Sequence, residues 1–263
     1  MTRTLALITG ASSGIGAAYA RLLAEDHDLV LVARRADRLS GLAEELGSRG
    51  AAVEVLPADL GTRDGIAAVT GRLAAGGVGM LISNAGAGGY SPLVDVDPDD
   101  IEPLLTLNAV APVQLVRAAL PAMLAAGEGT IITVASLLAF SAGSMDPRAP
   151  RRTLYVAAKA ATLGFTRTLA GELADTPVRV QVVCPGVVAT DWNSGAGHSI
   201  PWAMSPEGVA SASLAGLSLG ETVCAPGLED QDAALDALLA AEAALVTGGN
   251  RPTLAARYTG PRA

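Results

Sequence analysis

Ser136, Tyr155 and Lys159 have side chains suited to proton transfer at a carbonyl oxygen. Tyr155 and Lys159 lie four positions apart in a segment with helical periodicity, so their side chains share one helix face. An ammonium group beside a phenol favours the phenolate, so Lys159 is expected to lower the pKa of Tyr155. Ser136 ends a β-like run, where its hydroxyl can hydrogen-bond a substrate oxygen. The three residues predict an acid–base site, although a Tyr–Lys pair at this spacing is also an ordinary exposed helix pair.

A glycine-rich turn, TGASSGIG at residues 9–16, follows the first strand-like run and opens a helical segment. Gly10, Gly14 and Gly16 allow a tight turn and a close approach of the backbone to a pyrophosphate group. The helix N-terminus then offers free N–H groups and the positive end of its dipole to that anion. The strand–turn–helix context favours dinucleotide binding over a simple connecting turn.

The second strand-like run is followed by Arg34 and Arg35, at the position that decides which nicotinamide dinucleotide a site prefers. Guanidinium groups bind a 2′-phosphate and a carboxylate repels it, so the sequence favours NADP(H). Asp37 is near enough to keep NAD(H) as an alternative, and both arginines could instead be solvated surface charges. Asp59, after the third run, is expected either to meet an adenine amino group or to cap a turn.

The elements that must position these residues are short apolar runs alternating with longer helical segments. The runs are nearly continuously apolar, as expected for parallel strands covered on both faces, and span 5–9, 29–33, 52–56, 79–83, 130–136 and 178–184. The helical segments span 14–26, 37–49, 63–76, 99–126 and 153–174, with a short strand at 222–225 and a helix at 229–246 after them. This alternation predicts an α/β fold with a doubly wound parallel sheet.

The composition fits one α/β domain and argues against nucleic-acid binding. The chain has 263 residues, is 50% hydrophobic and only 3% aromatic, and carries a net charge of −8. Cys184 and Cys224 lie in apolar runs and are expected to be reduced core thiols. The N-terminus lacks the apolar region of a signal peptide, and the apolar segment 104–126 is interrupted by polar residues and prolines. A cytoplasmic location without membrane association is therefore expected.

Several motifs together resemble the short-chain dehydrogenase/reductase family over about residues 4–225. They are TGASSGIG at 9–16, NAG at 84–86, Asn108, Ser136, YVAAK at 155–159 and the Pro-Gly pair at 185–186, and VARRADRL at 32–39 is similar to NADP-preferring members. The resemblance implies a Rossmann-type sheet of about seven strands in the order 3-2-1-4-5-6-7. It selects Ser136 over its neighbours Ser141 and Ser144 as the catalytic serine.

The resemblance also implies roles for individual residues. Asn108 holds a water that relays protons to Lys159, although by sequence alone Asn108 could simply mark a kink near Pro112. Lys159 also bonds the nicotinamide ribose, and Asn84 mainly braces the central sheet. The cofactor-binding residues implied are Gly10, Ser12, Ser13, Gly14, Ile15, Gly16, Arg34, Arg35, Asp59, Leu60, Asn84, Ala85, Gly86, Tyr155, Lys159, Pro185, Gly186, Val188 and Thr190.

Two segments depart from the family pattern or vary within it. The gap between the catalytic serine and tyrosine is longer than usual, and the surplus is predicted to form a loop at 144–152. Its arginines, Arg148, Arg151 and Arg152, could meet an acidic substrate or a partner, or be solvated loop charges. A substrate lid is expected near 189–212. Its candidate pocket residues are Trp192, Trp202 and Met204, with lid packing as the alternative.

These observations predict a single domain, 1–263, with a weakly structured tail at 247–263. The function expected is NADP(H)-dependent interconversion of a ketone or aldehyde and an alcohol, with Tyr155 as general acid and base. The alternatives are an alcohol dehydrogenase working oxidatively with NAD(P) and a non-catalytic NADP(H) sensor on the same fold. His27 and His198 are isolated, so no metal site is predicted. The resemblance implies a homodimer or homotetramer through the helices at 99–126 and 153–174.

Overall fold

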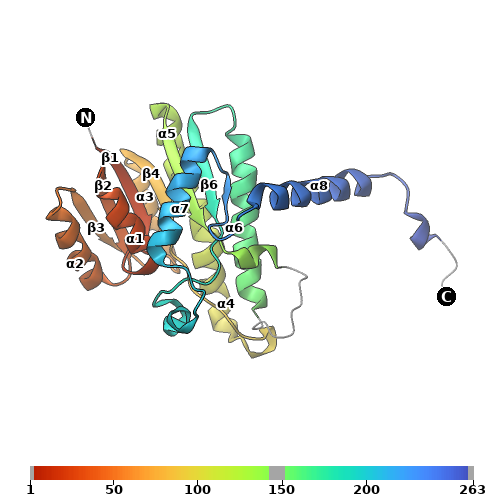
Figure 1. Ribbon diagram of the computed structural model, residues 1–263, viewed down its shortest axis with the longest axis horizontal. Helices are drawn as coiled ribbons and strands as arrows, with labels where there is room; N and C mark the ends of the chain where they lie inside the picture. Colours follow the sequence, from red (N-terminus) through yellow and green to blue (C-terminus); the bar gives the residue numbers. More distant parts are fainter. Residues whose placement is uncertain (1–2, 142–151, 260–263) are drawn as a thin grey trace. The chain divides into compact units, whose positions relative to one another are not determined.

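The sheet has seven parallel strands in the order β3-β2-β1-β4-β5-β6-β7, as predicted (Figure 1). The structure, a computed structural model, describes residues 3–141 and 152–259, apart from the side chains of residues 192–194. The strands are β1 (Thr4–Thr9), β2 (His27–Ala33), β3 (Val53–Pro57), β4 (Val78–Ser83), β5 (Gly129–Val134), β6 (Val178–Val183) and β7 (Val223–Cys224). The predicted strands are therefore confirmed, with shifts of one or two residues at their ends.

Alternate residues along the strands enter two separate cores, one on each face of the sheet. Ile8 of β1 belongs to a core covered by α1 (Gly14–Leu23), α2 (Ala36–Gly47) and α7 (Pro206–Leu219). Leu7 belongs to the opposite core, covered by α3 (Arg63–Ala74), α5 (Ala111–Ala126) and α6 (Thr153–Glu172). Because both faces are covered, the strands are apolar at nearly every position, which is the pattern seen in the sequence.

The segment predicted as one helix at 99–126 contains a π-helical turn. It consists of α4 (Pro98–Leu105), the π-helix η2 (Thr106–Val110) and α5. By length and composition alone, 98–126 is the one helix among the described residues that could cross a membrane. In the fold, Leu115 and Val116 of α5 lie in the core against the sheet. Packing within the domain therefore accounts for apolar residues of this helix.

Helix α7 was not predicted, because its sequence is rich in small residues and shows little periodicity. Its ends nevertheless carry local signals. The Ser205 hydroxyl accepts a hydrogen bond from the backbone N–H of Gly208, and Pro206 stands at the first helical position. Gly220 follows the helix with a left-handed φ of 80°. These signals place the end of the irregular part of the predicted lid at Ser205 rather than at residue 212.

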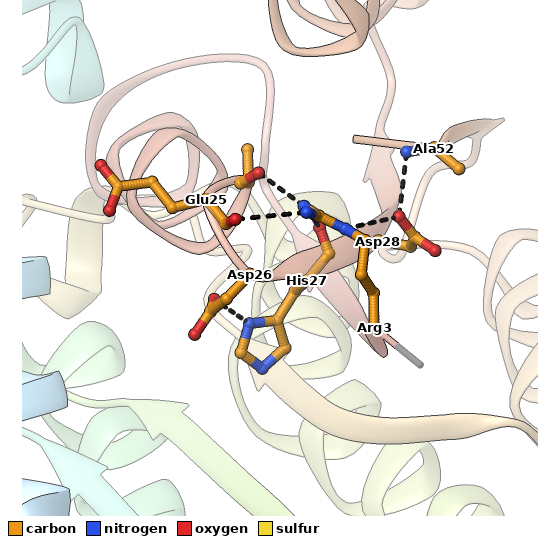
Figure 2. Close-up of polar contacts among 7 residues, drawn as sticks. Arg3, Glu25, Asp26, His27, Asp28 and Ala52 are labelled. Atoms are coloured by element: carbon orange, nitrogen blue, oxygen red, sulfur yellow. Dashed lines mark hydrogen bonds and ion pairs between the residues drawn. The ribbon is translucent and has the colours of Figure 1, made fainter. Parts of the chain in front are cut away.

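Arg3 ties the start of β1 to the end of α1 and the start of β2 (Figure 2). Its guanidinium donates to the backbone carbonyls of Ala24 and His27, at 2.6 and 2.7 Å. Its Nε also donates to the Asp28 carboxylate at 3.0 Å, and the same carboxylate oxygen accepts from the N–H of Ala52. One side chain thus satisfies the Ala24 carbonyl, which the end of α1 leaves without a helical partner, and binds the first residue of β2.

The chain forms two compact units, residues 1–226 and 227–263. The second unit holds α8 (Gln231–Gly249), which was predicted, and the short 3₁₀ helix η5 (Ala256–Tyr258). The side chains of Leu239 and Leu245 in α8 are 51% and 75% exposed. All the site residues described below belong to the first unit, and the prediction of a single domain stays a prediction.

Candidate active site

One cavity of about 980 Å³ lies at the carboxyl ends of the strands. It is lined by segments that follow β1, β2, β3, β4, β5 and β6, which is where open α/β sheets bind ligands. Every described site residue predicted from the sequence lines this cavity, except Gly16, Trp202 and Met204. Residues more than 150 positions apart in the chain therefore meet in one place.

The three glycines of the glycine-rich turn have no room for side chains. A Cβ atom on Gly16 would lie 2.4 Å from the carbonyl oxygen of Gly10, and one on Gly10 would lie 2.7 Å from Asn84 Nδ2. Gly10 and Gly14 also have left-handed φ angles of 68° and 55°. Gly16 thus brings α1 against the turn without lining the cavity itself. The resulting backbone cradle at the N-terminus of α1 fits a pyrophosphate.

Arg35 connects the end of β2 to this turn. Its Nη2 donates to the hydroxyls of Ser12 and Ser13, both at 2.8 Å. Ser13 is the N-cap residue of α1 and makes no side-chain cap bond to the helix. Arg34 beside it is exposed and has no ion pair among the described residues. The cavity therefore has two cations next to the anion cradle, which suits a phosphate on the adenosine ribose.

Asn84 and Thr9 brace the two central strands at the cavity floor. Asn84 Nδ2 donates to the carbonyl oxygen of Thr9 at 2.9 Å. The Thr9 hydroxyl accepts from the N–H groups of Asn84 and Ala85, at 2.9 and 3.0 Å. Asp59 similarly accepts from the N–H of Gly61 while lining the cavity, so its turn role is present in the structure.

Ser136, Tyr155 and Lys159 come together at the other end of the cavity. Ser136 follows β5 and caps the 3₁₀ helix η3 (Leu137–Phe140), while Tyr155 and Lys159 lie in α6. The side chains of Ser136 and Tyr155 are hydrogen-bonded. Lys159 Nζ lies 5.8 Å from the Tyr155 ring centroid and donates to the carbonyl oxygen of Val134 at 2.9 Å. All three residues are buried.

Burial sets the acidity of this group, and it corrects one expectation. The pKa of Lys159 is lowered from 10.5 to about 8 because its ammonium group is removed from water. The pKa of Tyr155 is raised above its ordinary value, chiefly by burial and also by the nearby Tyr90. The expectation of a lowered Tyr155 pKa is therefore wrong, because desolvation of the phenolate outweighs the lowering effect of the Ser136 hydroxyl, and Lys159 is not among the causes of the shift.

Asn108 is fully buried in the π-helical turn, and its side chain is satisfied by backbone. Its Nδ2 donates to the carbonyl oxygens of Ala87 and Leu104, at 3.1 and 3.0 Å. A Cβ on Gly86 would lie 2.9 Å from Asn108 Oδ1 and 3.3 Å from Lys159 Nζ. Gly86 thus keeps open a polar space between the amide and the ammonium group, and π-turns often occur at such functional positions.

The loop at Pro185–Thr190 closes the cavity beyond β6. The carbonyl oxygen of Pro185 accepts from the N–H of Leu137 at 3.0 Å, which joins this loop to η3. Thr190 lies beside Gly14, since a Cβ on that glycine would be 2.9 Å from Thr190 Cγ2. Cys184, just before the loop, is a free buried thiol whose pKa is raised to about 12 by burial. The second cysteine, Cys224, is also free and buried.

Two of the substrate-pocket residues predicted from the lid, Trp202 and Met204, do not line the cavity. Trp202 is 76% exposed, and Met204 packs against the core that holds α7. The side chain of Trp192 lies outside the described residues. Tyr90 and Ile200 line the cavity instead, and the sequence analysis missed both. Tyr90 was detectable as a rare aromatic residue shortly after the NAG motif.

The arginines of the extra loop divide between the described and undescribed parts of the chain. Arg148 and Arg151 lie outside the described residues, and so does most of the predicted loop at 144–152. Arg152 is the N-cap residue of α6 and lines the cavity. Among the residues described, no group of three or more His, Cys, Asp or Glu side chains is placed so that it could hold a metal ion.

A dinucleotide cradle and a Ser–Tyr–Lys group on a doubly wound sheet define the class of oxidoreductases that use a nicotinamide coenzyme. The family description "short chain dehydrogenase" matches residues 4–200. An uncharacterized oxidoreductase of Staphylococcus aureus is 31% identical over 221 residues, which are 83% of this chain and 92% of that protein. The chain belongs to the short-chain dehydrogenase family, as predicted.

Solved structures of family members are similar over nearly the whole chain. The short-chain dehydrogenase from Sphingobium yanoikuyae, in complex with NADPH, is 37% identical with a TM-score of 0.89, covering 97% of this chain and 99% of its own. The bulky-bulky ketone specific alcohol dehydrogenase from Comamonas testosteroni is 31% identical with a TM-score of 0.87, covering 99% and 100%. Both likenesses extend beyond the family match, which ends at residue 200.

Proposed function

We propose that this chain is an NADP(H)-dependent oxidoreductase that reduces a ketone or aldehyde to an alcohol. The observation that carries the proposal is the meeting of Ser136, Tyr155 and Lys159 in the same cavity as the glycine cradle. The complex of the Sphingobium yanoikuyae relative with NADPH supports the choice of coenzyme, and so do Arg34 and Arg35. Asp37 leaves NAD(H) as the weaker alternative.

The residues that would hold the coenzyme follow from the shape of the cavity. The backbone around Gly10, Gly14 and Gly16 would hold the pyrophosphate, with Arg34 and Arg35 on the 2′-phosphate. Lys159 would bond the nicotinamide ribose. When bound, the reduced nicotinamide supplies a hydride to the carbonyl carbon. The remaining predicted cofactor contacts, from Asp59 to Thr190, are proposed on the same ground, since they line the same cavity.

The chain's own side chains would carry out the proton transfer to the carbonyl oxygen. Ser136 donates a hydrogen bond to the carbonyl oxygen and orients it, and Tyr155 then gives its phenolic proton to that oxygen. The raised pKa of Tyr155 keeps the phenol protonated at neutral pH, which suits a proton donor in reduction. Lys159, with a pKa of about 8, can return a proton to Tyr155 through the polar space beside Asn108 and Gly86. In oxidation the same groups would work in reverse.

Incubation with NADPH and a panel of ketones and aldehydes tests the proposal, with consumption of NADPH followed by absorbance. We expect turnover that is faster with NADPH than with NADH. Turnover of secondary alcohols alone would support the oxidative alternative. Binding of NADPH, seen as a raised melting temperature, without turnover of any compound would support the sensor instead.

A further inference from the structure

Tyr90 is a large side chain at the reacting end of the cavity that the proposed reaction does not use. It lies in the loop after β4, and its ring packs on Tyr155 with centroids 5.6 Å apart and planes tilted by 40°. It is half-buried and lines the cavity. The chain has only four tyrosines and is 3% aromatic, so the pairing of two tyrosines at the reacting hydroxyl is unusual for this composition.

Aliphatic side chains line the same cavity as Tyr90, and the charged Arg152 acts on the Tyr90 phenol. Leu137, Leu138 and Ile200 line the same cavity, and Leu137 remains 40% exposed. Lys159 also lines the cavity, but its ammonium group donates a hydrogen bond to the carbonyl oxygen of Val134. Arg152 is the N-cap residue of α6. A substrate group bound in this cavity can therefore contact aliphatic side chains, the Tyr90 ring and the Arg152 side chain.

The charged coenzyme-side residues are too far away to shape this end. Arg34 follows β2, whereas Ser136 follows β5, and β1 and β4 stand between those strands. Three strand spacings amount to about 14 Å. Arg34 is therefore too far from Ser136 to select among carbonyl compounds, whereas Tyr90 packs on Tyr155 itself.

Resting on the proposed function, we propose that Tyr90 is a specificity-determining residue that stacks on the ring of an aryl ketone. The ring of the substrate would lie against Tyr90 while its carbonyl oxygen meets Ser136 and Tyr155. Aromatic pairs in offset or edge-to-face contact gain stability beyond that of area burial alone. That gain corresponds to a preference of about 2- to 10-fold for an aryl group over a saturated ring of the same size.

Two ketones that differ only in aromaticity test the proposal, acetophenone and cyclohexyl methyl ketone. The quantity compared is the ratio of their kcat/KM values with NADPH in the wild type, Tyr90→Phe and Tyr90→Leu. Because aryl ketones are intrinsically less reactive, the change of this ratio between variants is the readout. We expect Tyr90→Phe to keep the wild-type ratio, and Tyr90→Leu to lower it about 2- to 10-fold, mainly through KM for acetophenone.

The outcomes separate this inference from the proposed function. If the wild type reduces neither ketone nor any other carbonyl compound, the proposed function fails. If it reduces both and Tyr90→Leu leaves the ratio unchanged, the function stands and the inference about Tyr90 is wrong. Melting with and without NADPH checks that each variant is folded. A ratio lowered equally by Tyr90→Phe would assign the effect to the hydroxyl and would also overturn the stacking proposal.

Discussion

The two halves of the cavity are built on different principles. The half after β1 and β2 presents backbone atoms and the exposed cations Arg34 and Arg35. The half after β5 presents Ser136 and Tyr155, whose side chains are only 7% and 6% exposed. The first half thus depends on shape and long-range charge, and the second depends on removal of side chains from water.

This difference predicts different consequences of substitution in the two halves. A change in the first half should alter coenzyme affinity or preference while leaving the proton chemistry intact. A change that removes the Ser136 or Tyr155 hydroxyl should alter turnover while leaving coenzyme affinity nearly unchanged, whereas Lys159 would also bond the nicotinamide ribose. The predictions below test that separation, beginning with the largest expected effect.

Tyr155→Phe should reduce kcat about 100- to 10,000-fold, because the proton donor is lost while the ring remains. The raised melting temperature produced by NADPH in the wild type should persist in the variant. Tyr258→Phe is a matched control, because Tyr258 is 66% exposed and belongs to the second unit. Loss of NADPH binding together with turnover would show that the two halves are not separable.

Gly16→Ala should weaken NADPH binding about 10- to 100-fold, because the new Cβ would lie 2.4 Å from the carbonyl oxygen of Gly10 and must push α1 away. Titration of NADPH by its fluorescence measures the change. Gly71→Ala in α3 is the control, since nothing lies within 4 Å of a Cβ there. A variant that binds NADPH normally would contradict the role of this close approach.

The same contrast explains what the sequence could and could not predict. The glycine cradle was predictable because its residues are close together in the sequence. At each glycine a larger side chain would clash with neighbouring atoms. The strand order was predictable because alternating runs and the family motifs agree. Tyr90 was missed because its contact with Tyr155 joins segments 65 positions apart. No repeating pattern of residue types in the sequence indicates such a contact. The direction of the Tyr155 pKa shift was missed because burial is not readable from spacing.

Arg34→Glu should lower the preference for NADPH over NADH about 10- to 100-fold. A charge-assisted contact to the 2′-phosphate is replaced by repulsion, while NADH loses nothing comparable. The ratio of kcat/KM values for the two coenzymes measures it. Arg63→Glu is the control, because it makes the same change in net charge at a position outside the cavity. An equal shift in both variants would attribute the preference to the overall charge of the protein.

Lys159→Met tests the buried half through stability, with the smallest expected effect. In the folded chain the pKa of Lys159 is about 8, whereas the unfolded chain keeps the ordinary value of 10.5. Between these values the unfolded state binds more protons, so the contribution of Lys159 to stability grows as pH rises through 8 and is lost as pH falls. The free energy of unfolding of the wild type, relative to Lys159→Met, should therefore increase by about 1 kcal/mol from pH 7.5 to 9.

Urea unfolding of both proteins at the two pH values measures this difference. The contributions of the groups that titrate in both proteins cancel in the comparison. A constant difference would mean that water reaches the Lys159 ammonium group, and the catalytic half would then resemble the exposed coenzyme half.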